Sequence, residues 1–440
     1  MKRVIVEGVF VNSDRTFKGQ IEIINGVIRN IGKNLGNADF SFDDNHLIFP
    51  GFGDVHIHAR EDQTEIQNYK EDYDTVCKAA INGGVVHISA MPNTPQPLTS
   101  DKFLQWHRKR VSDMPITVIN YAGIGPGTLP LETNVPYKAY TGPSVGPLFF
   151  KNEEQLRQTL IHYKKKPISF HVEDYDLLEE SKNNDTHDKR RPVECVLKAL
   201  SYVLDLIEEF DIDAKLCHWN CADESFEMIK MHRSKGYKTK VEVSPLHLFF
   251  DTDLLEAKPE LWPYLQMNPA LQSKSHRLQL IEALREGFID LVATDHAPHQ
   301  LDEKFKNFGS EEEYKKLRDT NLDECIALSK KDGTSGTPQL DTFSLIMTWL
   351  IKEHNFTPED IARIASENPG KFVNQFQDDK FGRIEEGYTG SLTVLNTNKP
   401  TELTRDYIKS KARWSPFENI TFPGSVAMTM HKGVVVHDQN

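Results

Sequence analysis

Short β-branched runs alternate with stretches of helical periodicity through the middle of this 440-residue chain, and this alternation restricts the fold more than any other feature. The pattern is typical of βα units arranged around a parallel sheet. One helix is clear over residues 193–207, where apolar residues recur at spacings of three and four. The eight β-like runs lie near residues 53–58, 85–91, 116–123, 137–141, 168–173, 215–219, 240–247 and 291–297. Eight such repeats predict an α/β fold of the (β/α)8 type, a TIM barrel.

Both ends of the chain have a different pattern, in which short β-like runs are separated by Gly, Pro and Asn. Residues 4–31 read as a hairpin that turns at Asn25-Gly26, and β-like runs return at 390–395, 425–430 and 433–436. We therefore expect a small β-sandwich domain built from residues 1–50 and 381–440, with the barrel spanning residues 51–380. The charged stretch at 301–336 is expected to be a solvated loop with a helix, and a lid is the alternative.

Composition excludes several classes of protein. The net charge is −13 and no basic stripe interrupts it, which argues against nucleic acid as a partner. The mean hydropathy is −0.52, and no apolar run is long enough to span a membrane. The five cysteines are scattered and odd in number, and the start of the chain lacks the pattern of a signal peptide, so we expect reduced thiols and a cytoplasmic location.

The sharpest local motif is PGFGDVHIH at residues 50–58, followed by Arg60. Side chains alternate along a strand, so His56 and His58 point to the same face and both imidazoles can reach one metal ion. Taken alone, the motif also fits two histidines on a wet strand face.

The same chemistry recurs at three other predicted strand ends, with His171, His218 and Asp295. Each of these alone would fit a hydrogen-bonded core histidine or a capping aspartate. Barrel active sites, however, gather at the C-terminal ends of different strands, where all five residues fall. Four imidazoles and a carboxylate suit zinc first, with manganese or cobalt as substitutes, and five ligands exceed one tetrahedral site, which favours two metal ions.

Lys138 on the fourth predicted strand bears on this hypothesis. An ammonium at this position would repel two cations, whereas carboxylation by CO₂ would reverse its charge and supply a bridging anion. An unmodified exposed lysine is the alternative interpretation. Cys217 and Cys221 flank His218 and suggest a thiolate zinc site, but buried thiols are favoured because no second cysteine pair accompanies them.

At this point the sequence resembles the cyclic amidohydrolases, and among them the dihydroorotases, over nearly its whole length. The strand-one motif PGFGDVHIHAR, the segment MPNTP at 91–95 and ATDHAPH at 293–299 carry the resemblance. Further similarity lies in Tyr137-Lys138 and in MNP at 267–269, and Arg191 with Glu194 belongs to a structural pattern of the family. Two departures are Glu61-Asp62, where a Glu-Pro-Gly turn is usual, and the added length of the segment from 300 to 336.

The resemblance implies the reaction and the site residues. One zinc ion would be held by His56, His58, Lys138 and Asp295, and the other by carboxylated Lys138, His171 and His218. Asp295 would be the catalytic proton carrier in the reversible, zinc-dependent cyclisation of N-carbamoyl-L-aspartate to L-dihydroorotate in pyrimidine biosynthesis. The substrate, a small molecule, would be bound by Arg60, Asn93, Asn268 and His299.

Two alternatives stay open at the level of sequence. A dihydropyrimidinase, hydantoinase or allantoinase would share the barrel and the metal ligands. A catalytically silent scaffold is a different class of protein, although all six ligand positions are filled here. The sequence is compatible with a homo-oligomer and does not reveal its size.

Overall fold

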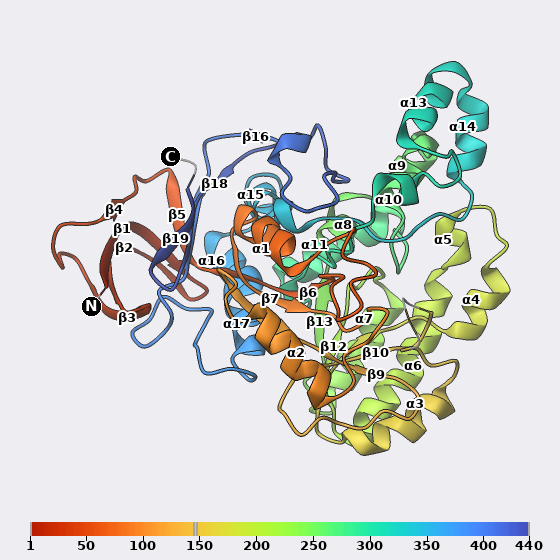
Figure 1. Ribbon diagram of the computed structural model, residues 1–440, viewed down its shortest axis with the longest axis horizontal. Helices are drawn as coiled ribbons and strands as arrows, with labels where there is room; N and C mark the ends of the chain where they lie inside the picture. Colours follow the sequence, from red (N-terminus) through yellow and green to blue (C-terminus); the bar gives the residue numbers. More distant parts are fainter. Residues whose placement is uncertain (1, 144–145, 147, 439–440) are drawn as a thin grey trace.

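The computed structural model describes residues 2–143, 146 and 148–438, and within them the chain forms an α/β fold with parallel sheets (Figure 1). One sheet has the order β6-β7-β8 and the other the order β14-β13-β12-β11-β10-β9, with every pairing in both parallel. The strands are β6 (Phe52–Ile57), β7 (Val85–Ala90), β8 (Thr117–Asn120), β9 (Ala122–Ile124), β10 (Tyr137–Tyr140), β11 (Pro167–His171), β12 (Asp213–Leu216), β13 (Lys240–Val243) and β14 (Leu291–Val292).

The two parallel sheets adjoin at both of their edges. Only Tyr121 separates β8 from β9 along the chain. At the other edge, Ile57 pairs in parallel with His296, and the amide of His58 donates to the carbonyl of His296 at 2.8 Å. All eight predicted runs therefore contain strands, and the run at 116–123 contains two.

The predicted runs at 240–247 and 291–297 extend furthest beyond the observed strands. The run at 240–247 ends at Val243, because Ser244 caps a helix that has Pro245 in its first turn. The run at 291–297 ends at Val292, where the chain leaves the sheet and Asp54 accepts hydrogen bonds from the amide and hydroxyl groups of Thr294.

Helices cover the parallel strands and α6 is the longest of them. It spans Val193–Phe210, so the predicted helix at 193–207 is confirmed, and its buried stripe packs into the main core. The other α-helices of the part of the chain before residue 300 are α1 (Tyr73–Asn82), α2 (Asp101–Val111), α3 (Glu153–Leu160), α4 (Tyr175–Ser181), α5 (His187–Arg190), α7 (Glu224–Ser234), α8 (Pro245–Phe249), α9 (Thr252–Ala257), α10 (Trp262–Leu265) and α11 (Lys274–Arg285). After residue 336 come α15 (Phe343–Glu353), α16 (Pro358–Ile361) and α17 (Asn368–Val373). No helix in the described ranges is long and apolar enough to cross a membrane.

The segment at 301–336 is more ordered than expected. Instead of a loop with one helix it forms α12 (Leu301–Lys304), α13 (Glu311–Thr320) and α14 (Leu322–Ser329), and the last two stand away from the body of the molecule (Figure 1). Phe305, Tyr314 and Cys325 make a small apolar core of their own. The exposed faces of α13 and α14 are highly charged, and their apolar positions are few and widely spaced. The sequence pattern therefore did not predict these two helices.

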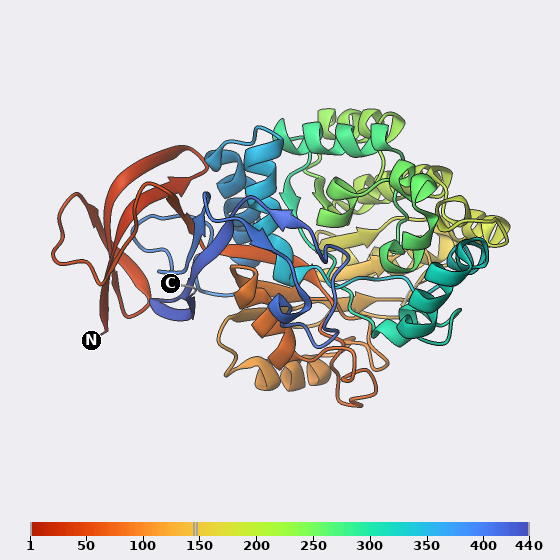
Figure 2. The same ribbon diagram turned by 90° about the horizontal axis from the view of Figure 1, so that it is seen from above.

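Strands from both ends of the chain share one sheet, at the left of Figures 1 and 2. Its order is β19-β18-β15-β5-β1-β2-β3, and β4 pairs with β1 off this path. The antiparallel pairing of β5 with β15 joins the two ends, as the sequence predicted, and Asn25 and Gly26 make the predicted turn with φ of 50° and 84°. These strands are β1 (Arg3–Asn12), β2 (Arg15–Ile24), β3 (Val27–Gly32), β4 (Phe40–Ser41), β5 (His46–Pro50), β15 (Leu392–Asn396), β18 (Ser425–His431) and β19 (Val434–Asp438), and the short β16 (Thr401–Glu402) and β17 (Thr421–Phe422) pair separately.

Candidate active site

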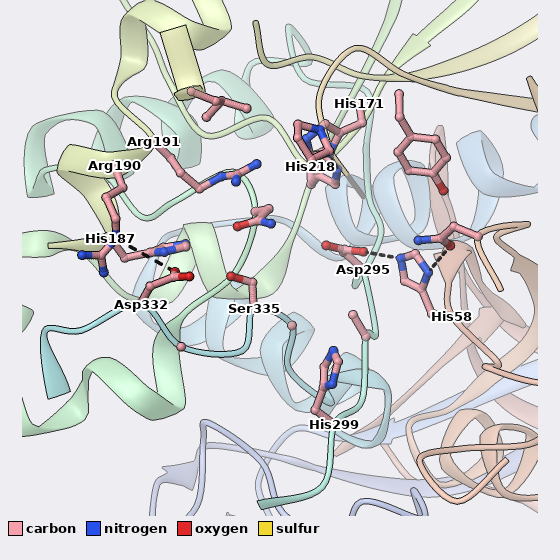
Figure 3. Close-up of a pocket in the computed structure, with 18 of the residues that line it drawn as sticks. His58, His171, His187, Arg190, Arg191, His218, Asp295, His299, Asp332 and Ser335 are labelled. Carbon is pink, nitrogen blue, oxygen red and sulfur yellow. Dashed lines mark hydrogen bonds and ion pairs between the residues drawn. The ribbon is translucent and has the colours of Figure 1, made fainter. Parts of the chain in front are cut away.

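A cavity of about 470 Å³ opens where the parallel strands end (Figure 3). Most of the residues predicted to carry function line it, because their strands all run toward this face. His171 is the last residue of β11, His218 follows β12 by two residues, and Asp295 follows β14 by three. The predicted residues that line the cavity are His56, His58, Arg60, Asn93, His171, His218, Asn268, Asp295 and His299.

The imidazoles and the carboxylate converge at the base of the cavity. Asp295 Oδ1 lies 3.2 Å from His56 Nε2 and 3.0 Å from His58 Nε2. His171 Nδ1 lies 3.0 Å from His218 Nε2. Two ligands of one tetrahedral zinc ion stand roughly 3.3 Å apart. The observed separations are close to that value, so the donor atoms fit a divalent metal ion.

A second layer of side chains holds the imidazoles in this orientation. The outward Nδ1 of His56 contacts Glu242, Nδ1 of His58 lies 2.7 Å from Asn93 Oδ1, and Nε2 of His171 lies 2.6 Å from Glu173. The remaining ring nitrogen of each histidine then faces the centre. Partners of this kind fix the tautomer and the ring position of a metal-binding histidine.

Glu242 and Glu173 are themselves paired with buried or half-buried cations. Lys215 contacts Glu242, and Arg191 donates from Nε to Glu173 Oε1 at 3.0 Å. Sequence reasoning missed Lys215 and Glu242, and it treated Arg191 only as part of a structural pattern. A buried Lys–Glu pair on neighbouring strands is visible only once the register of β12 and β13 is known.

The charges of the centre favour ligation. Burial raises the pKa of Asp295, but His56, His58 and His218 outweigh this effect and hold that pKa well below its usual range. Burial lowers the pKa of His58 to about 4, and burial together with His171 and Lys138 lowers the pKa of His218 well below its usual value. An ionised carboxylate and neutral imidazoles are the forms that bind metal. His56 differs, because Glu242 overcomes the effect of burial and raises its pKa.

Lys138 lies on β10 beneath the centre and is completely buried. Its Nζ has no hydrogen-bond partner among the described residues, and it lies 5.2 Å from the centroid of the Tyr140 ring. A buried ammonium without a partner is costly. A carbamate at this atom would remove the positive charge and add oxygen ligands, so the environment of Lys138 fits that modification.

Two groups of three side chains in the described part of the chain could hold a metal ion. One consists of His56, His218 and Asp295, and the other of His56, Cys217 and Glu242. In the second group Glu242 is already engaged by Lys215, whose Nζ also lies 3.6 Å from Cys217 Sγ. Cys217 and Cys221 are both buried and free, in keeping with the interpretation of them as core thiols.

The polar groups predicted to bind substrate line the same cavity as this centre. Arg60 is buried, and its Nη2 lies 3.3 Å from His299 Nε2. Asn268 Oδ1 is buried and has no hydrogen-bond partner among the described residues. Asn93 also lines the cavity, although its Oδ1 accepts from His58. The wall across the cavity from His58 and Asp295 carries groups that were not predicted to act in the site, and those labelled in Figure 3 are His187, Arg190, Arg191, Asp332 and Ser335.

Three residues of the site have left-handed backbone. The φ angles are 59° at Arg60, 37° at His218 and 49° at Asp295. Non-glycine residues adopt this region at a cost, and such strain clusters at functional sites. Here it lets the chain turn sharply at a strand end and direct a side chain into the cavity.

Comparison with known proteins identifies the family of this chain. The model of the amidohydrolase family matches residues 160–436, and the chain belongs to that family. Its sequence relatives include proteins named dihydroorotase. The one from Pyrococcus furiosus is 26% identical, and the match covers 99% of this chain and 93% of the relative. The one from Halalkalibacterium halodurans is 28% identical, and the match covers 100% of this chain and 99% of the relative.

Solved structures share the fold. The L-hydantoinase (dihydropyrimidinase) from Arthrobacter aurescens superposes with a TM-score of 0.85 at 20% identity, covering 100% of this chain and 97% of that one. The dihydropyrimidinase from Brevibacillus agri gives a TM-score of 0.81 at 19% identity, with 99% and 95% covered.

Proposed function

We propose that this amidohydrolase is a dihydroorotase, which interconverts N-carbamoyl-L-aspartate and L-dihydroorotate. The observation that carries the proposal is the buried guanidinium of Arg60, which faces His299 inside the cavity and stands beside the imidazole–carboxylate centre. A planar guanidinium matches a carboxylate bidentately. The full-length relatives named dihydroorotase support the same substrate.

We assign two divalent cations, zinc with manganese or cobalt as substitutes, to the centre. His56, His58 and Asp295 would bind one cation, and His171 and His218 would bind the other. A carbamate on Lys138 would be a ligand of both cations. When bound, such ions polarise a carbonyl oxygen and lower the pKa of water toward neutrality. The support is the 3.0–3.2 Å spacing of the donor atoms and the partnerless Nζ of Lys138.

The side chains of the chain then have distinct tasks. Arg60, Asn93 and His299 bind the substrate carboxylate, and Asn268 meets the edge of the ring. In hydrolysis, the Asp295 carboxylate accepts a proton from the attacking water and donates it to the leaving ring nitrogen. In the reverse direction, protonated Asp295 donates its proton to the departing oxygen as the ring closes.

The remaining assignments complete the proposal. The adjoining edges of the two parallel sheets support a closed (β/α)8 barrel over residues 51–380, and the shared sheet supports a β-sandwich domain of residues 1–50 and 381–440. Of the proposed β-sandwich domain, residues 1, 439 and 440 lie outside the described part of the chain.

The five free cysteines support a cytoplasmic location. The partner is the small-molecule substrate, and a homo-oligomer is compatible with the chain.

A dihydropyrimidinase or hydantoinase is the second candidate, favoured by the TM-score of 0.85 with a hydantoinase. Metal analysis of the purified protein, with turnover of L-dihydroorotate, dihydrouracil and allantoin measured side by side, tests both. We expect bound zinc and a clear preference for L-dihydroorotate. Preference for an uncharged ring would transfer the assignment to the second candidate. Metal binding without turnover of any of the three substrates would favour the alternative of a catalytically silent scaffold.

A further inference from the structure

His299 has two different neighbours at one ring nitrogen. Its Nδ1 lies 3.2 Å from Lys70 Nζ, which can only donate a hydrogen bond, and 3.3 Å from Glu303 Oε2, which can only accept one when ionised. Lys70 and Glu303 form an ion pair with each other at 2.7 Å. At the opposite nitrogen, Nε2 faces Arg60 Nη2.

A neutral imidazole carries its single proton on one of these nitrogens. Burial, together with the charges of Arg60 and Lys70, lowers the pKa of His299 to about 3, so the ring is neutral near pH 7. With the proton on Nδ1, the ring donates to Glu303 and accepts from Arg60 at Nε2. With the proton on Nε2, it accepts from Lys70 at Nδ1 and offers Nε2–H to the cavity. Both tautomers leave the ring fully hydrogen-bonded, provided that a ligand accepts from Nε2 in the second.

The surrounding structure holds the three residues in place. Trp414 donates from Nε1 to the carbonyl oxygen of His299 at 2.8 Å, and the hydroxyl of Tyr69 donates to Glu303 Oε1 at 2.8 Å. Burial raises the pKa of Glu303, but the hydrogen bonds from His299, Lys70 and Tyr69 outweigh it and keep that pKa well below its usual range. Glu303 therefore stays an acceptor and Lys70 remains beside it.

We propose that Lys70 and Glu303 are positioning residues that select the tautomer of His299. In the free protein Glu303 accepts a hydrogen bond from Nδ1–H of His299, and Arg60 donates to Nε2. When a ligand carboxylate draws Arg60 away, the proton transfers from Nδ1 to Nε2 through solvent, Lys70 donates to Nδ1, and Nε2–H joins Arg60 on the carboxylate. The charge of the ring does not change. The inference rests on the proposed function in that the ligand carboxylate is the one assigned to Arg60.

The kinetic experiment compares Lys70→Met, Glu303→Gln and an exposed control, Lys230→Met, whose ammonium pairs with Glu227 far from the cavity. We expect Lys70→Met to raise KM for L-dihydroorotate about tenfold with kcat within about twofold, because the hydrogen bond from the Lys70 ammonium to the imidazole is lost from the bound state. Glu303→Gln should leave KM unchanged or lower it, since it weakens the free-state tautomer. In a His299→Ala background Lys70→Met should have no further effect on KM.

A second measurement needs no turnover. Nitrogen-15 spectra of the imidazoles, with the His299 signals identified by their loss in His299→Ala, should show Nδ1–H in the free wild-type protein and Nε2–H in free Glu303→Gln. An equal rise of KM in both variants, a full effect of Lys70→Met without His299, or the same tautomer in both spectra would overturn the proposal. Absence of L-dihydroorotate turnover by the wild type would instead defeat the proposed function, and the spectra would still decide the tautomer.

Discussion

The two walls of the cavity are built in different ways. On the strand-end wall, His56, His58 and His171 are buried, and each has a second partner that fixes its ring. On the facing wall, Arg190 donates to the backbone carbonyls of Asn184 and Lys330, and the Asp332 side chain is 72% exposed. The contrast indicates that buried side chains hold the reacting centre, whereas the facing wall relies on hydrogen bonds to backbone carbonyls and leaves the Asp332 carboxylate exposed.

Removal of metal tests the strand-end wall most severely. We expect a strong chelator to abolish turnover of L-dihydroorotate and to lower the melting temperature, because an ion that binds only the folded state stabilises it. Zinc, manganese or cobalt should each restore activity in proportion to the metal bound. Full activity in protein shown by elemental analysis to be free of metal would contradict the assignment.

Asp295→Asn should have the largest effect among single substitutions. The amide cannot carry the proton between water and the leaving nitrogen, so kcat should fall about 10³-fold or more. Circular dichroism should show an unchanged fold, because the amide is isosteric with the carboxylate. Turnover within tenfold of the wild type would remove Asp295 from the proposed role.

Arg60→Lys tests substrate recognition on the same wall. An ammonium keeps the charge but loses the bidentate geometry, and we expect KM for N-carbamoyl-L-aspartate to rise about tenfold. Steady-state kinetics in the direction of ring closure measure this directly. If KM stays the same, Arg60 does not bind the carboxylate.

Asp332→Asn on the facing wall should have the smallest effect. The carboxylate is largely exposed and lies 4.0 Å from Arg190 Nε, and exposed pairs of this kind contribute little. We expect kcat/KM to change by less than about twofold. A loss comparable to that of Arg60→Lys would show that the facing wall takes a direct part in recognition, and the contrast between the walls would no longer hold.

The strand-end wall was also the wall that the sequence predicted. His56, His58, His171, His218 and Asp295 fall at the ends of short β-branched runs, and parallel strands bring their C-terminal ends to one face. Lys215 and Glu242 could not be found in this way, because their contact depends on strand register. The facing wall escaped prediction because Asp332 and Ser335 lie in a loop after α14, whose position depends on how three short, highly charged helices pack.

The shared sheet of the chain ends has a consequence for synthesis. Strand β5 at residues 46–50 meets β15 at residues 392–396, so its hydrogen-bonding edge is completed only after β15 has left the ribosome. Chains emerge from the N-terminus and fold as they are made. The nascent protein therefore carries an open β-edge for most of translation, and a truncated chain that ends before residue 392 keeps that edge available for pairing with another chain.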